Sequence, residues 1–302
     1  MNTENEKAKI ILKILNKIEV TSLIQSRWNG LKLLRENLGD KNIDYKSYGG
    51  YELFFKNQES LFNDCCNKIN YINKIIYPIF NRTVFSIINT PFEFKNILNK
   101  CVYNPLEGQI DVGKMMNSLV AKTINKGGKI LTGINVNKVF ENGKIRINDN
   151  FEINAKNIIV TTNGFSKKLI NVPLSPARAQ VLITRPISNL KIKGIFHIDR
   201  GYYYFRNIDN RILFGGGRHL DKKVEETTEF GLNEKIQTKL FDILQHSILP
   251  KTKFEVEQKW SGIMGMGPDK KPIIKKISNR LYCAVKLGGM GIAIGNNVGK
   301  LV

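Results

Sequence analysis

The sequence predicts an α/β fold, and three features of the chain point to it. The first is a short apolar run at residues 281–285, which stops at a glycine turn over residues 288–291. A short apolar run between turn signals is typical of a buried strand. The second is a helical pattern over residues 111–124 that is followed by short β-like runs. The third is a series of alternating segments between residues 174 and 218, which predicts an antiparallel sheet.

The glycine turn is a candidate ligand site. A strand, a glycine turn and a helix bring backbone N–H groups and the positive end of the helix up to an anion. Apolar and small residues continue after the turn at helical spacing, and Gly291, Gly295 and Gly299 predict a closely packed face. On spacing alone, a tight strand-to-helix connection without a ligand explains the turn equally well. The candidate contacts are Gly288, Gly289, Met290 and Gly291.

The N-terminal part of the chain predicts helices. Over residues 4–38, apolar residues recur at the i, i+3, i+4 and i+7 positions of a helix. Residues 48–55 suit a strand after a turn, and residues 57–76 return to helix. The two apolar faces of the first segment are formed by Ile11, Ile14, Leu15 and Ile18, and by Trp28, Leu31, Leu34 and Leu38.

The middle of the chain predicts one more helix and several short strands. Asp111 is a suitable N-cap for the helix, and Asn142-Gly143 is a hairpin turn. Beyond the antiparallel segments we expect a helix over 225–248 and a returning strand over 254–259. The short β-like runs lie at 129–131, 136–140, 144–147 and 158–160.

Composition limits the functional classes. The chain has 302 residues, of which 42% are hydrophobic, so a large core in one or two domains is expected. Its four cysteines and three histidines lack metal-ligand spacing, so we expect no metal site. The polar start resembles no signal peptide, and no apolar run reaches the ~18 residues of a transmembrane segment. The sequence therefore predicts a cytoplasmic protein.

The net charge is strongly positive, at +21. Such a charge attracts nucleic acid or an anionic surface. The lysines, however, are spread along the chain, and no aromatic residues are interleaved with them in an RNA-binding pattern. We interpret the charge as compositional bias, so that a nucleic-acid partner stays open but is not favoured.

A candidate substrate face lies in the antiparallel region. Because side chains alternate along a strand, Tyr202, Tyr204 and Arg206 fall on one face. Two phenols and a guanidinium suit an anionic or carboxylate-bearing ligand. A solvated strand face is the alternative.

Four pieces of the chain, taken in order, resemble the D-amino-acid-oxidase-like (DAO) family of FAD-dependent oxidoreductases. They are the strand and polar turn 157–164, the paired segments 202–218, the sequence WSGIMGMGPDKKP at 260–272, and the run and turn 281–291. The family includes glycine and sarcosine oxidases and amino-acid dehydrogenases. The resemblance covers nearly the whole chain.

The resemblance implies an FAD/NAD(P)-binding, Rossmann-like domain interwoven with an antiparallel-sheet substrate domain. Residues 1–40 would form a helical segment over the cofactor region. The substrate domain would take residues 41–105 and 171–254. The FAD-binding domain would take residues 106–170 and 255–302.

The resemblance also implies a reaction, in which a C–N bond of a small-molecule amine or amino acid is oxidised by hydride transfer to the flavin of FAD. No catalytic side chain is assigned. The turn 288–291 would lie at the pyrimidine edge of the flavin, and the backbone of Val136 would face the adenine, although ordinary strand packing also explains Val136. The residues expected near the ribose and pyrophosphate are Thr161, Thr162, Asn163 and Gly164.

Two departures from the family pattern matter. Met264 stands where several relatives place an arginine that holds the substrate carboxylate, which argues against a simple α-amino acid unless Arg206 takes over. The sequence also contains no strand followed by G-x-G-x-x-G, the motif that holds the pyrophosphate. We therefore expect an incomplete family member that lacks the first βαβ unit and is colourless and aggregation-prone alone. Two other interpretations stay open, namely the flavin domain of a tRNA-modifying enzyme and an inactive remnant that does not bind FAD.

Overall fold

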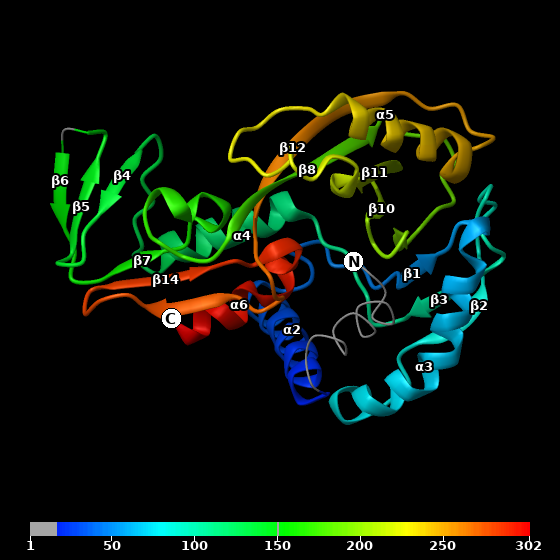
Figure 1. The fold of residues 1–302 in the computed structure, drawn as a ribbon, viewed down its shortest axis with the longest axis horizontal. Coiled ribbons are helices and arrows are strands. Elements are labelled where there is room, and N and C mark those ends of the chain that lie inside the picture. Colours follow the sequence, from blue (N-terminus) through cyan, green and yellow to red (C-terminus); the bar gives the residue numbers. More distant parts are fainter. Residues whose placement is uncertain (1–16, 150) are drawn as a thin grey trace.

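The computed structural model describes residues 17–149 and 151–302. Its largest element is an eight-stranded sheet in the order β12-β8-β11-β10-β9-β1-β3-β2 (Figure 1). Neighbouring strands are antiparallel, except that β1 and β9 run parallel. The strands are β1 (Gly50–Leu53), β2 (Ser86–Asn89), β3 (Lys100–Asn104), β8 (Ser175–Thr184), β9 (Ile195–Ile198), β10 (Tyr203–Ile208), β11 (Arg211–Gly216) and β12 (Val256–Met266).

One face of this sheet carries the main hydrophobic core. It is covered by helix α5 (Glu234–Ile243) and the π-helical turn that continues it, Leu244–Ile248. Alternation along the strands sends Phe196, Phe205 and Phe214 into this core, where they are almost fully buried. The residues between them face the other side of the sheet, toward helices α2 (Lys17–Leu38) and α6 (Gly291–Leu301).

A second, three-stranded sheet contains the apolar run that the sequence singled out. Its order is β13 (Ile273–Lys276), β14 (Leu281–Val285) and β7 (Ile158–Val160). Strands β14 and β7 run parallel, with Leu281 opposite Ile158. Because the carboxyl ends of parallel strands meet at one edge, the segments that follow β7 and β14 emerge together.

The remaining elements complete a mixed α/β molecule, as predicted. A third sheet of β4 (Val136–Val139), β5 (Lys144–Ile147) and β6 (Phe151–Asn154) lies at one end (Figure 1). Helix α3 (Glu59–Phe80) packs against Phe54 and Val102. Helix α4 (Val112–Asn125) has the predicted cap, since the Asp111 side chain accepts a hydrogen bond from the Lys114 N–H at 2.9 Å. Short 3₁₀ turns occur at Lys56–Gln58, Asn163–Lys168, Arg218–Asp221 and Gly288–Met290.

Several local predictions are wrong. Residues 129–131 form no strand, and Leu131 is 75% exposed with no partner strand in the described chain. The helix expected over 225–248 begins only after Asn233, whose side chain caps it. The closely packed face of α6 consists of Ala293, Ile294 and Val298, whereas a side chain at Gly295 or Gly299 would meet open space. The expected helical face at Ile11, Ile14 and Leu15 lies outside the described residues.

Within the described ranges, no helix is long and apolar enough to cross a membrane. The same residues contain no group of three or more acidic, histidine or cysteine side chains placed to hold a metal ion.

Candidate active site

The segments that follow β7 and β14 are joined to each other and to β12. The Asn163 side chain accepts a hydrogen bond from the Leu287 N–H at 3.1 Å. Gly164 lies so close to β12 that a Cβ there would come within 2.8 Å of the Met264 carbonyl oxygen. Asn163 and Gly288 both have positive φ angles, 43° and 56°. The polar turn and the glycine turn therefore form one tightly packed edge.

The glycine turn leads directly into helix α6. The N–H groups in the first turn of a helix have no acceptor within the helix and carry partial positive charge. A Cβ placed on Gly289 would meet only the Met264 Sδ, at 3.9 Å, so the backbone of Gly289 is open on its outer side. The structure thus presents bare peptide groups at the positive end of α6.

This turn borders a cavity of about 260 Å³, which we call the central cavity. Gly289 and Met290 line one side, and Arg27 and Trp28 of α2 line another. Asn104 and Glu107, at the end of β3 and just beyond it, line the side toward the large sheet, and most of the remaining lining is apolar. A second cavity of about 230 Å³ adjoins it, since Trp28, Leu31, Leu106, Gly108, Ile195 and Ile292 line both.

Tyr204 and Arg206 lie on the sheet face that the alternation predicts. Tyr203 and Phe205 enter the core, so Tyr204 and Arg206 point to the opposite side. Arg206 lines the second cavity, and its Nη1 donates to the Ile110 carbonyl oxygen at 2.9 Å. Burial lowers the pKa of Arg206 and raises that of Tyr204.

The comparisons with known proteins decide the family. A sequence model described as FAD dependent oxidoreductase (DAO) matches residues 22–302. The chain belongs to this family. A comparison with curated protein sequences finds no match.

Solved structures of DAO enzymes share the fold. L-proline dehydrogenase from P. horikoshii is similar with a TM-score of 0.73 and 18% identity, over 92% of this chain and 77% of the other. Iminodiacetate oxidase from Chelativorans sp. BNC1 has a TM-score of 0.73 and 14% identity, over 94% and 78%. Glycine oxidase from Geobacillus kaustophilus has a TM-score of 0.71 and 15% identity, over 92% and 76%.

The other predicted site residues do not all lie at one place in the structure. Met264 is half-buried on β12, beside Gly289. Thr161 and Thr162 are exposed, and the Thr162 Oγ1 lies 3.1 Å from the Ser166 Oγ. Tyr202 stands just before β10, half-exposed, with its ring centroid 4.2 Å from that of His219. Val136 lies in the small end sheet and lines neither cavity.

Sequence reasoning missed a polar row on the cavity side of the large sheet. Glu52, His197 and Tyr204 are direct partners across β1, β9 and β10. Glu52 and His197 are buried, and the His197 Nε2 lies 3.5 Å from the Glu107 Oε2. The signal was available, because Glu52 and His197 are isolated polar residues within apolar strands.

The residues fit FAD at one end of the cofactor. The open backbone at Gly289 and the start of α6 suit the electron-rich edge of a flavin ring. The sequence supplies no glycine-rich loop of the kind that holds a pyrophosphate.

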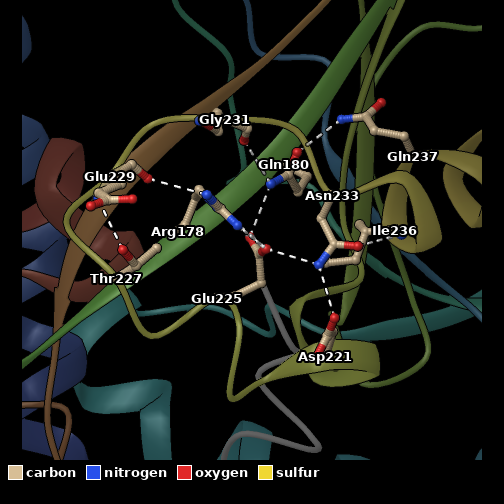
Figure 2. A network of polar contacts seen from close by, with 11 residues as sticks. Arg178, Gln180, Asp221, Glu225, Thr227, Glu229, Gly231, Asn233, Ile236 and Gln237 are labelled. Carbon is tan, nitrogen blue, oxygen red and sulfur yellow. Dashed lines mark hydrogen bonds and ion pairs between the residues drawn. The ribbon is translucent and has the colours of Figure 1, made fainter.

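In this DAO-family chain, a buried ion pair fixes the loop over residues 225–233, which lies next to the polar turn (Figure 2). Glu225 is fully buried and accepts hydrogen bonds from Arg178 at 2.8 Å, Gln180 at 2.9 Å and Asn233 at 3.0 Å. Burial alone would raise the pKa of Glu225, but these hydrogen bonds outweigh it and the pKa is lowered. The loop that Glu225 anchors carries Phe230, whose ring centroid lies 6.1 Å from that of Phe165, immediately after Gly164.

Proposed function

We propose that this chain is a flavoenzyme that oxidises a C–N bond of a small amine or amino acid. The observation that carries the proposal is the central cavity, where the open glycine turn at the start of α6 faces the large sheet. Bound FAD would supply the hydride acceptor. The names of the similar structures support the substrate class, since they describe a dehydrogenase of L-proline and oxidases of iminodiacetate and glycine.

The chain's own residues would take separate roles. The N–H groups of Gly288, Gly289, Met290 and Gly291 would stabilise negative charge beside the start of α6. Tyr202, Tyr204 and Arg206 would contact the substrate, and Met264 would form an apolar wall next to Gly289. Thr161, Thr162, Asn163 and Gly164 are proposed to lie near the ribose and pyrophosphate, and Val136 near the adenine.

The proposed domain division follows the two larger sheets. Strands from 41–105 and 171–254 form most of the eight-stranded sheet, and we assign them to the substrate domain. Strand β12, from the segment 255–302, completes that sheet and connects it to β13 and β14. The chain thereby leaves the large sheet after Met266, whose Sδ lies near Gly288 of the proposed flavin edge.

The cofactor proposal is tested with a matched pair of glycine variants. Gly289 and Gly262 both have room for a side chain. A Cβ at Gly289 meets only the Met264 Sδ, at 3.9 Å, and a Cβ at Gly262 meets nothing within 4 Å. A ligand that packs on the bare backbone of Gly289 is displaced by Gly289→Val but unaffected by Gly262→Val. Since the sequence has no G-x-G-x-x-G, we expect weak FAD binding by the wild-type chain. Gly289→Val should weaken it at least about tenfold, or ~1.4 kcal/mol.

The measurement is equilibrium dialysis against FAD, followed by anaerobic reduction of the flavin with a panel of amines and amino acids at saturating FAD. Equal FAD affinity in the two variants would contradict the proposed flavin edge. Failure of every amine and amino acid to reduce the flavin would contradict the proposed reaction.

A further inference from the structure

Lys286, the residue between β14 and the glycine turn, has a backbone conformation that is unusual for a lysine. Its φ angle is 64°, in the left-handed region that glycine adopts without steric cost. Its side chain is only 6% exposed, which is uncommon for this residue type. A residue persists in such a conformation only where its neighbours hold it, and conformations of this kind concentrate at functional sites. The contacts of Lys286 therefore indicate what its conformation serves.

Two contacts hold Lys286 against the loop over residues 267–272, which joins β12 to β13. The aliphatic part of its side chain lies across Gly267, where an added Cβ would come within 2.5 Å of the Lys286 Cδ. Its Nζ donates a hydrogen bond to the Asp269 Oδ1 at 2.7 Å, and the same oxygen accepts the Lys271 N–H at 2.9 Å. Burial alone would raise the pKa of Asp269, but these hydrogen bonds outweigh it and the pKa is lowered. The ion pair thus ties the loop to the end of β14.

The conformation of Lys286 sets the path of the glycine turn. Leu287 has right-handed helical angles, with φ −76° and ψ −12°, and Gly288 returns to a positive φ of 56°. Alternation of left-handed and right-handed residues makes successive backbone N–H groups converge, as in an anion-binding nest. The Leu287 N–H donates to the Asn163 Oδ1 at 3.1 Å, and two residues later Gly289 lines the central cavity. A change of backbone conformation at Lys286 would therefore redirect the N–H groups of the proposed flavin edge.

The charge of Lys286 is not offered to a ligand, because the Asp269 carboxylate neutralises it at 2.7 Å. Its role is then conformational. We propose that Lys286 is a positioning residue, whose ion pair with Asp269 holds the left-handed backbone from which the glycine turn runs to the central cavity. Neither the glycine spacing nor the family resemblance singles out this lysine. The inference rests on the proposed function only for one consequence, that a loosened turn binds FAD less tightly.

Single and paired substitutions separate the ion pair from the rest of the side chain. Lys286→Met keeps an aliphatic side chain but removes the charge, and Asp269→Asn keeps the shape but removes the carboxylate. Because both act on one contact, the double variant should behave like either single variant. Lys286→Arg keeps the charge and should retain most of the wild-type behaviour. Lys276→Met is the matched control, because Lys276 lies exposed on β13.

Hydrogen exchange, measured by mass spectrometry on the complete 302-residue chain without FAD, reports on the turn directly. We expect exchange over residues 286–291 to be at least about tenfold faster in Lys286→Met and Asp269→Asn, because breaking a buried pair frees the segments that it joined. Exchange over β10 and β11, in the interior of the large sheet, should match the wild type. Unchanged exchange over 286–291 overturns the proposal, and so does equal acceleration across the whole chain. If Lys286→Met fails to fold, Asp269→Asn decides by the same criteria.

Equilibrium dialysis against FAD then tests the consequence for the cofactor. A turn that is less often in the competent conformation weakens the apparent affinity, so the Kd for FAD should rise at least about threefold in Lys286→Met and Asp269→Asn. It should stay unchanged in Lys276→Met. Faster exchange with unchanged affinity would make the pair an ordinary loop tether and overturn its positioning role. If the wild-type chain itself binds no FAD, the proposed function fails, while the exchange experiment still decides whether Lys286 sets the turn.

Discussion

The charge of Glu225 is fully enclosed, and its partner Arg178 is almost as deeply buried. Removing one charge of a buried pair leaves the other uncompensated and typically costs about 3–5 kcal/mol. Glu225→Gln should therefore lower the free energy of unfolding by that amount in urea titrations. Glu226→Gln, at the exposed next position, is the matched control and should change it by no more than ~0.5 kcal/mol. A Glu225→Gln variant as stable as this control would contradict the role of the pair.

The same residue predicts a pH dependence. A carboxyl group whose pKa is lowered by folding stabilises the protein above its unfolded pKa of about 4.3. That contribution is lost as the pH falls through the lower pKa of the folded state. The pKa of Glu225 is lowered in the folded chain, so wild-type stability should decline more steeply below about pH 4.3 than that of Glu225→Gln. Parallel curves of unfolding free energy against pH would be inconsistent with this shift.

Sequence reasoning placed individual residues correctly where the alternation of side chains along a strand decides which sheet face they occupy. Tyr204 and Arg206 do share one sheet face, because the pleat alone determines it. The Glu52–His197 pairing depends instead on which strands become neighbours across nearly 150 residues, and no local pattern specifies that. Isolated polar residues in apolar strands are the only trace that such a pairing leaves in the sequence.

Helices α2 and α6 cross at close range, and this contact holds the glycine turn that precedes α6. A Cβ on Gly30 would overlap the Ala293 carbonyl oxygen, so the two helices approach at backbone distance there. Gly30→Ala should therefore lower the unfolding free energy by ~1–3 kcal/mol despite the better helix propensity of alanine. Gly295→Ala enters open space in α6 and should raise it by ~0.5–1 kcal/mol.

Chemical denaturation of both variants measures these opposite effects. If both variants change the unfolding free energy in the same direction, helix propensity and not the helix crossing controls stability here. The start of α6 depends on this crossing, so Gly30→Ala should also weaken FAD binding if the proposed flavin edge is correct.

Elements whose ends are specified locally could be predicted, and the others could not. The strand 281–285, its glycine turn and the helix after it follow from a few neighbouring residues, as does the Asp111 cap. Residues 225–233 form a loop and not the expected helix, because Glu225 is hydrogen-bonded to Arg178 on β8 and Gly231 has a φ of 152°. Residues 129–131 have a strand-like composition, but a strand also needs a neighbour, and the described chain offers none.

At the scale of the whole molecule, the candidate site is assembled from segments far apart in sequence. The central cavity combines α2, the segment beyond β3, strand β9 and the start of α6. The family resemblance predicted that the segment 1–40 and the turn 288–291 both lie at the cofactor, whereas their spacing in the chain carries no such information. We therefore expect the proposed function to depend on the packing of α2 and α6 beside the large sheet more than on any single motif.

The net charge of +21 is the whole-molecule property with a direct test. If it reflects composition alone, the chain should bind tRNA through non-specific contacts with phosphates. Such binding releases counterions, so its affinity falls steeply with salt and reaches Kd values of only ~10⁻⁴–10⁻⁶ M at physiological ionic strength. Filter binding across a salt series should therefore give a steep slope, and a single-stranded RNA of unrelated sequence and equal length should bind as well as tRNA. At 0.15 M salt, interactions between surface charges are screened beyond ~8 Å. Sub-micromolar binding that persists at this salt concentration and prefers tRNA would therefore require a shaped RNA site and would favour the tRNA-modifying alternative.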